Sequence, residues 1–160
     1  MPDLCEFEIK TRIGIDLNPV NLKSTEEALW NLALIWPDQN ERINRFREAT
    51  SLLVDCPLSF RKGPGTNMLN EIIPNIPAED ALIIMHSFTL NQFTSAERES
   101  FNEVIARHSI PRAIWRINLE WLGTKHPELK VQFYSKGLLR NTILLAECRG
   151  HGDWIDWQLK

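Results

Sequence analysis

The feature that most constrains the fold is an uninterrupted apolar run, Ala81-Leu82-Ile83-Ile84-Met85. A run of this length without a polar position favours a β-strand that is covered on both faces over a strand at the surface. Its chain direction brings His86 and Ser87 to the carboxyl end of the strand. The run therefore predicts a sheet with helices packed on its faces.

The segments around this run alternate between strand and helix patterns. Strict period-two alternation from Cys5 to Ile15 predicts a strand with one buried face. Two capping boxes, Ser24 with Glu27 and Thr94 with Glu97, predict the starts of two helices. The other elements expected before the C-terminal region are a helix opened by Asp38 and Glu41, a strand at 57–61, a helix capped by Asn67, and a strand at 113–119.

The C-terminal region has a different pattern. Two β-rich runs, Leu129 to Tyr134 and Leu138 to Glu147, flank Ser135-Lys136-Gly137, which predicts an antiparallel hairpin. Strands that alternate with helices and end in a hairpin are typical of a mostly parallel sheet in a three-layer α/β fold. We expect one domain over residues 1–160, because this length and 43% hydrophobic residues suffice for one core.

Composition excludes several classes of function. Lys and Arg are scattered and the net charge is −3, so we expect no nucleic-acid partner. Neither a bilayer-length apolar segment nor a signal-peptide pattern is present, which predicts a cytoplasmic protein. The three cysteines lack metal-ligand spacing, and we assign no metal site. Trp30 and Trp36 are expected in the core, and Trp154 and Trp157 are expected to cover an edge or a partner.

Several segments together carry a family resemblance. These are Gly14-Ile15-Asp16-Leu17-Asn18-Pro19-Val20-Asn21-Leu22, the Trp36-Pro37 pair, His86-Ser87, and His151 to Trp157. With them the chain resembles the C-terminal half of a bacterial family, domain of unknown function 2332, related to Rossmann-like methyltransferases. The resemblance implies a methyltransferase-type sheet whose first strand and glycine-rich loop are missing from this chain.

The same resemblance implies roles for four residues. In such folds a carboxylate after a strand holds the ribose of S-adenosylmethionine, which assigns Asp16, with Asn18 beside it, to cofactor binding. His86 and Glu120 lie at the carboxyl ends of their predicted strands, where ligands gather, and we expect His86 or Glu120 to be the catalytic general base.

Each of these assignments has an alternative. Asp16 can instead cap its own Asn-Pro turn, and Glu120 can pair with Arg116 or meet solvent. His86 and Ser87 also permit a hydrolase with Asp55 or Asp80 as a third member, although the glycines of a nucleophile elbow are lacking.

The leading hypothesis is S-adenosylmethionine-dependent methyl transfer to a small molecule. The alternative is a non-catalytic α/β interaction module, because loss of a central strand leaves sheet edges that must be covered or paired. In that case the sheet is completed by homodimerisation or by a separately encoded N-terminal half.

Overall fold

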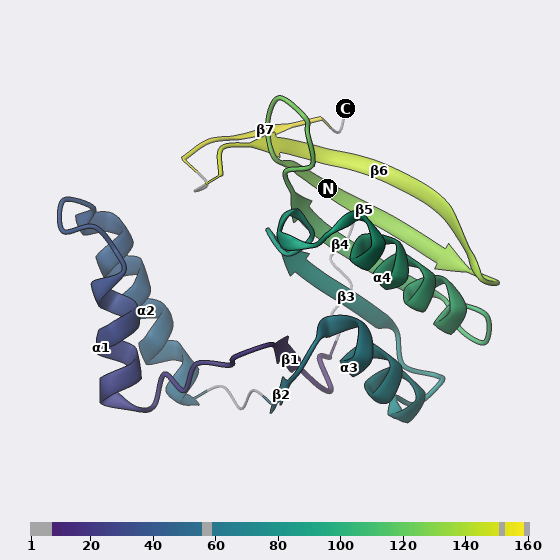
Figure 1. The fold of residues 1–160 in the computed structure, drawn as a ribbon, viewed down its shortest axis with the longest axis horizontal. Coiled ribbons are helices and arrows are strands. Elements are labelled where there is room, and N and C mark those ends of the chain that lie inside the picture. The colour runs from purple at the N-terminus through teal and green to yellow at the C-terminus, as the bar shows by residue number, and fades with distance from the viewer. Residues whose placement is uncertain (1–7, 56–58, 151–152, 159–160) are drawn as a thin grey trace. The chain divides into compact units, whose positions relative to one another are not determined.

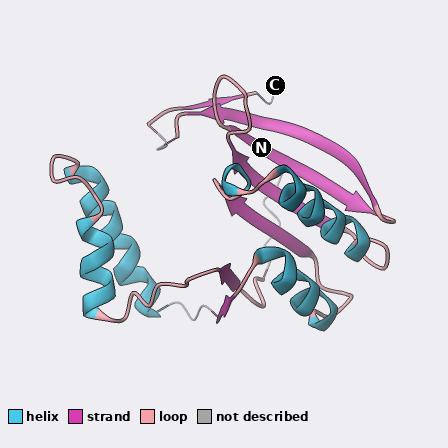
Figure 2. Ribbon diagram, in the orientation of Figure 1, coloured by secondary structure: helices cyan, strands magenta, loops and turns pink. Residues whose placement is uncertain are grey.

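The computed structural model describes residues 8–55, 59–150 and 153–158. The chain divides into two compact units, Met1–Met68 and Leu69–Lys160, which we call the N-terminal unit and the C-terminal unit. Figure 1 shows the order of their elements, and Figure 2 shows that both mix helices with strands. The predicted α/β class is confirmed at this level.

The N-terminal unit contains a short parallel pair of strands. β1 (Ile13–Asp16) pairs with β2 (Ser59–Lys62), and two helices lie between them in the chain, α1 (Thr25–Ala33) and α2 (Asn40–Asp55). The strand predicted from Cys5 is therefore much shorter within the described residues, since residues 8–12 are irregular and residues 1–7 lie outside the description. α3 (Gly65–Ile72) follows β2. It begins two residues before Asn67, so the prediction that Asn67 caps this helix was wrong.

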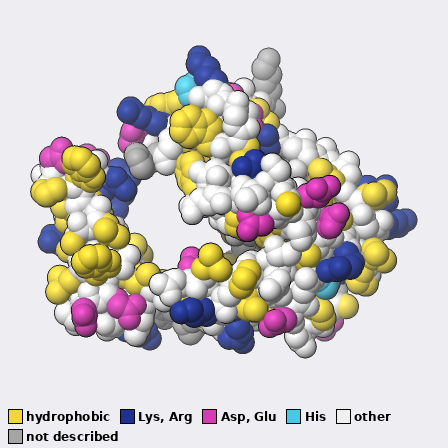
Figure 3. Space-filling view, in the orientation of Figure 1, with side chains coloured by type: hydrophobic (Ala, Val, Ile, Leu, Met, Phe, Trp, Pro, Cys, Tyr) yellow, Lys and Arg dark blue, Asp and Glu magenta, His cyan; other side chains and the backbone are white. Residues whose placement is uncertain are grey.

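Two tryptophans, one in α1 and one shortly after it, are exposed. Ser24 caps α1 as predicted, accepting a hydrogen bond from the Glu27 backbone N–H at 3.4 Å. Helical spacing placed Trp30 and Trp36 in the core, but they are 69% and 71% exposed. Hydrophobic side chains are visible at the surface of the space-filling view (Figure 3). The prediction of core positions was wrong because periodicity identifies an apolar helix face without identifying what covers it.

The C-terminal unit is built on a five-stranded sheet in the order β3-β4-β5-β6-β7. Its strands are β3 (Leu82–Ser87), β4 (Ile114–Glu120), β5 (Glu128–Ser135), β6 (Leu138–Cys148) and β7 (Ile155–Trp157). Only β3 and β4 are parallel, and the other three pairs are antiparallel. The expectation of a mostly parallel sheet was therefore wrong. Residues 121–127 join β4 directly to β5 without a crossover helix, so the two strands run antiparallel.

Local signals placed the helix and the hairpin of this unit correctly. α4 (Ser95–His108) starts at a complete Thr94–Glu97 capping box and connects β3 to β4. The predicted hairpin is β5–β6, and its turn residues Lys136 and Gly137 both have positive φ, as a tight two-residue turn requires. Two short 3-10 helices, Ile73–Asn75 and Leu90–Gln92, precede and follow β3.

The two faces of this sheet differ in what they carry. α4 lies over one face, where Phe101, Val104 and Ile105 are buried with Ile114 of β4. The β-strand register gives the opposite face a group of apolar side chains, nine of which are exposed in part, whereas Ala146, opposite Leu129 on the same face, is buried. We call this set the apolar face: Ile83, Met85, Trp115, Ile117, Leu119, Leu129, Val131, Phe133 and Ile143.

Candidate functional site

The fold brings His86 and Glu120 together. Each lies at the carboxyl end of its strand, and the parallel register of β3 and β4 puts those ends at one edge of the sheet. His86 Nδ1 lies 2.7 Å from Glu120 Oε1. Both side chains are buried beneath α4, and Glu120 is only 4% exposed. The catalytic roles assigned to these residues stay predictions, but their proximity is a property of the fold.

Glu120 holds the loop that follows β3. Its carboxylate accepts hydrogen bonds from three successive backbone N–H groups, those of Thr89 at 2.9 Å, Leu90 at 3.1 Å and Asn91 at 3.3 Å. Together with His86, four donors surround the two carboxylate oxygens. Hydrogen bonds of this number satisfy a buried carboxylate and fix the chain around it.

His86 is a neutral imidazole with its proton on Nδ1. Arg116 Nε donates a hydrogen bond to His86 Nε2 at 2.8 Å, and a guanidinium N–H can only donate. Nε2 must therefore be an acceptor, which leaves Nδ1–H to donate to Glu120. Burial lowers the pKa of His86, the charge of Arg116 lowers it further, and the hydrogen bond to Glu120 opposes both effects.

Arg116 extends the network to α4 and β5. Its Nη1 donates to Asn102 Oδ1 at 2.7 Å and to the Tyr134 hydroxyl at 3.3 Å. Its guanidinium carbon also lies 5.3 Å from the centre of the Phe101 ring. Arg116 is 3% exposed, so these contacts replace the water that a cation would otherwise require. We call Glu120, His86, Arg116 and Tyr134, together with Asn102, an exposed residue of α4 whose amide oxygen reaches Arg116, the buried network.

The buried network is suited to holding elements together. Both nitrogens of His86 and both oxygens of Glu120 already have partners, whereas a general base needs a free lone pair within reach of substrate. Ser87 is exposed, and neighbouring residues of a strand point to opposite faces, so Ser87 is directed away from His86. The geometry therefore gives no support to the hydrolase alternative.

Asp16 and Asn18 form a turn after β1 in the N-terminal unit. The Asn18 backbone N–H donates to Asp16 Oδ1 at 2.7 Å, which is the turn-capping alternative for Asp16. Lys62 Nζ donates to Asn18 Oδ1 at 3.0 Å and ties the turn to β2. Asp16 remains exposed at the carboxyl end of its strand, so the predicted contact with a cofactor ribose stays a prediction.

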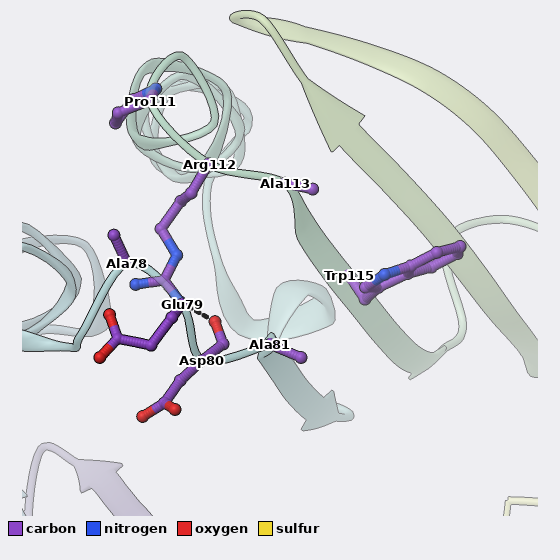
Figure 4. Close-up of a pocket in the computed structure, with 8 residues that line it drawn as sticks. All are labelled: Ala78, Glu79, Asp80, Ala81, Pro111, Arg112, Ala113 and Trp115. Carbon is purple, nitrogen blue, oxygen red and sulfur yellow. Dashed lines mark hydrogen bonds between the residues drawn. The ribbon is translucent and has the colours of Figure 1, made fainter. Parts of the chain in front are cut away.

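A shallow pocket lies at the other end of the parallel pair, where β3 and β4 begin. Its volume is about 240 Å³, and Figure 4 shows its lining residues, Ala78, Glu79, Asp80, Ala81, Pro111, Arg112, Ala113 and Trp115. The Arg112 guanidinium donates to the backbone carbonyls of Ile76 and Asp80. This charge therefore serves to join the two segments that lead into the strands.

Sequence reasoning missed most of the buried network. It named Arg116 only as a partner for Glu120, and it did not identify Asn102, Tyr134 or the turn at Thr89. A signal was present, because Arg116 and Glu120 are four residues apart in a strand and must share a face. Two opposite charges on the helix-covered face of a strand indicate a buried polar cluster.

Among the described residues, no group of three or more His, Cys, Asp or Glu side chains could hold a metal ion. None of the helices within the described ranges is long and apolar enough to cross a bilayer. Cys148 is a buried free thiol whose pKa is raised by burial, while Cys5 and Cys56 lie outside the description.

The fold and the buried network define a mixed α/β protein with two sheets. The chain belongs to the family described as uncharacterized protein conserved in bacteria (DUF2332), whose model matches residues 1–157. This confirms the family to which the motifs of the sequence pointed. No curated protein and no solved structure matches the chain. The likeness to methyltransferases stays a prediction.

Proposed function

We propose that this chain is an α/β interaction module that binds another polypeptide on the uncovered side of its five-stranded sheet. One observation carries the proposal: β3 has the sequence of a strand covered on both faces, yet it lies at the edge of the sheet. Ile83 and Met85 are 52% and 72% exposed. An apolar strand in this position is a template for pairing with another chain.

β3 lacks the features that protect natural sheet edges. Edge strands are usually blunted by lysine, proline or a bulge, and Leu82, Ile83, Ile84 and Met85 include none of these. β7, at the opposite edge, is only three residues long and carries Asp156 between two aliphatic or aromatic residues. The contrast between the two edges supports β3 as the binding edge.

A cover on the apolar face would complete a three-layer arrangement. α4 already occupies one face, and helices on the other would give the helix–sheet–helix order expected for a Rossmann-like fold. The partner is either a second copy of the chain or a separately encoded N-terminal half. Under this proposal the buried network supports the binding edge, because His86 belongs to β3 itself.

The test changes the chemistry of the edge. The double variant Ile83→Lys, Met85→Lys places charge on β3, and Leu138→Lys, an exposed apolar position in β6, is the matched control. We expect the native chain, and the control, to elute as a dimer or with a stoichiometric second polypeptide, and the double variant to elute as a folded monomer. A native chain that is monomeric and without a bound polypeptide at cellular concentration would contradict the proposal.

Methyl transfer from S-adenosylmethionine to a small molecule is the second candidate. The observation that favours it is the exposed Asp16 carboxylate at the carboxyl end of a parallel strand. The fit to the cofactor is incomplete, since the Asp16 carboxylate already accepts a hydrogen bond from the Asn18 backbone N–H in its own turn. We therefore derive no catalytic step through the cofactor.

Calorimetric titration distinguishes this candidate. Micromolar binding of S-adenosylmethionine that is lost in Asp16→Ala would support methyl transfer, with Asp38→Ala as a control for loss of one exposed carboxylate. The absence of heat at millimolar S-adenosylmethionine would contradict methyl transfer and leave the interaction module as the remaining candidate.

A further inference from the structure

The contact between His86 and Arg116 depends on the protonation of one nitrogen. Arg116 Nε donates to His86 Nε2 at 2.8 Å, while Nδ1 of the same ring lies 2.7 Å from Glu120 Oε1. A second proton on the ring would sit on Nε2 and face the Nε–H of Arg116, and neither group could then accept a hydrogen bond. The contact therefore exists only while His86 is neutral.

The charges that act on His86 come from β4 and have opposite signs. Burial lowers the pKa of His86 most, the charge of Arg116 lowers it further, and Glu120 raises it. The positive imidazolium formed in acid would be attracted to Glu120 and repelled by Arg116. Arg116 is therefore the side chain that protonation would displace.

α4 and β5 contribute uncharged groups around the imidazole. The Phe101 ring of α4 meets His86 edge-on, with ring centroids 5.6 Å apart. The Tyr134 hydroxyl of β5 reaches Arg116, and a phenol stays neutral in acid. The response of this region to acid therefore depends mainly on the second proton of His86.

Displacement of Arg116 would also affect its contact with α4. The guanidinium is planar and rigid, and its Nη1 donates to Asn102 Oδ1 at 2.7 Å while its Nε donates to His86. The group cannot turn Nε away from His86 and keep Nη1 in the same place. Arg116 is 3% exposed, so an Nε–H without an acceptor is costly until the side chain reaches water.

We propose that His86 and Arg116 form an acid-operated latch, in which a proton on His86 Nε2 displaces Arg116 and lets α4 open locally from the sheet. The hairpin of β5 and β6 stays folded in this transition, because its strands are paired from Glu128 to Ser135 and from Leu138 to Glu147 independently of His86. The latch goes beyond the proposed function and does not require a partner.

Nuclear magnetic resonance of the full chain tests the latch as the pH is lowered through 6.5, the ordinary pKa of histidine. The nitrogen shifts of His86 report which ring nitrogen carries a proton, and amide exchange, corrected for its intrinsic pH dependence, reports local opening. We expect Nε2 to be unprotonated at neutral pH. Below pH 6.5 we expect the protection of α4 to fall by about tenfold per pH unit, until the lowered pKa is reached, while the β5–β6 hairpin keeps its protection.

Three variants separate the latch from general acid sensitivity. His86→Gln retains a donor and an acceptor but does not titrate, so the protection of α4 should no longer depend on pH. His108→Gln, at the end of α4, is the matched control and should keep the dependence. Arg116→Met should raise the pKa of His86, because the repelling charge is removed.

Three results would overturn the latch. The first is a proton on Nε2 of the native chain at neutral pH, which is measured without any variant. The second is an equal loss of protection in α4 and in the β5–β6 hairpin, which would mean that acid unfolds the whole unit. The third is an unchanged pH dependence of α4 in His86→Gln.

Discussion

The two faces of the five-stranded sheet differ in the polar and apolar groups that they carry. The face beneath α4 buries Arg116, His86 and Glu120, whereas the opposite face exposes Ile83, Met85 and other apolar side chains. Burying charge is costly unless every group is hydrogen-bonded, and exposing a contiguous apolar surface is unusual unless it binds something. Under the proposed function, the face beneath α4 is complete within the chain, and the opposite face binds another polypeptide.

The largest expected effect is a loss of stability when Glu120 of the buried network is replaced. Glu120→Ala would leave the buried His86 side chain and the backbone N–H groups of Thr89, Leu90 and Asn91 without their acceptor. We expect the free energy of unfolding to fall by about 3–5 kcal/mol, as when one partner of a buried ionic network is removed. Urea denaturation measures this loss. Glu103→Ala on the exposed side of α4 is the control, and equal stability of the two variants would show that the buried network is not stabilising.

Replacing Arg116 is expected to lower stability less than replacing Glu120. Arg116→Met keeps an unbranched side chain of similar length but removes the donors to His86, Asn102 and Tyr134. Hydrogen bonds to charged groups contribute about 1.5–3 kcal/mol, so we expect a loss of about 2 kcal/mol in the same assay. A stability equal to or above that of the native chain would mean that the cation is retained for a reason other than stability.

The free energy of unfolding should decrease in acid because His86 is buried beneath α4 as a neutral side chain. The pKa of His86 is lowered in the folded chain, mainly by burial, so the unfolded chain takes up the proton first as the pH falls. The contribution of His86 to stability is therefore full above the ordinary pKa of 6.5 and is lost as the pH falls through the lowered value. Unfolding measured across this range should show the decrease, and His86→Gln should reduce it.

His108 needs a separate control in that experiment. Its pKa is also lowered, first by burial and then by Arg107, although it is more accessible than His86. The His108→Gln variant should retain most of the pH dependence. If His108→Gln removes the decrease and His86→Gln does not, the buried network is not the acid-sensitive element.

The smallest effect on stability is expected on the uncovered face. Met85→Thr and Ile83→Thr remove exposed apolar groups, and surface substitutions usually change stability by no more than about 0.5 kcal/mol. The same variants should weaken association, because the removed groups belong to the proposed interface. A large loss of stability in the isolated chain would indicate that this face is already packed.

The sequence predicted the elements that depend on neighbouring residues. The Thr94–Glu97 capping box and the Lys136-Gly137 turn act within a few residues, and both occur as expected. Asn67 was misplaced because a capping residue indicates a helix start only to within a few positions. Family membership was also recognisable from short motifs along the chain.

Features that depend on distant contacts could not be predicted. His86 and Glu120 were selected separately, and their contact depends on the register of two strands whose residues are 34 positions apart. The exposure of Trp30 could not be predicted either, because the apolar spacing of a helix does not show whether another element packs on that face. The Ala81–Met85 run indicated a strand covered on both faces, whereas Ile83 and Met85 are exposed in the structure.

Amide hydrogen exchange at β3 tests the central claim most directly. We expect the Ile83 and Met85 amides to exchange rapidly in the isolated chain and to become protected in the assembly purified from native cells. The Ile84 amide, which points to β4, should be protected in both. Rapid exchange of Ile83 and Met85 in both preparations would contradict the claim that the edge of β3 is a binding surface.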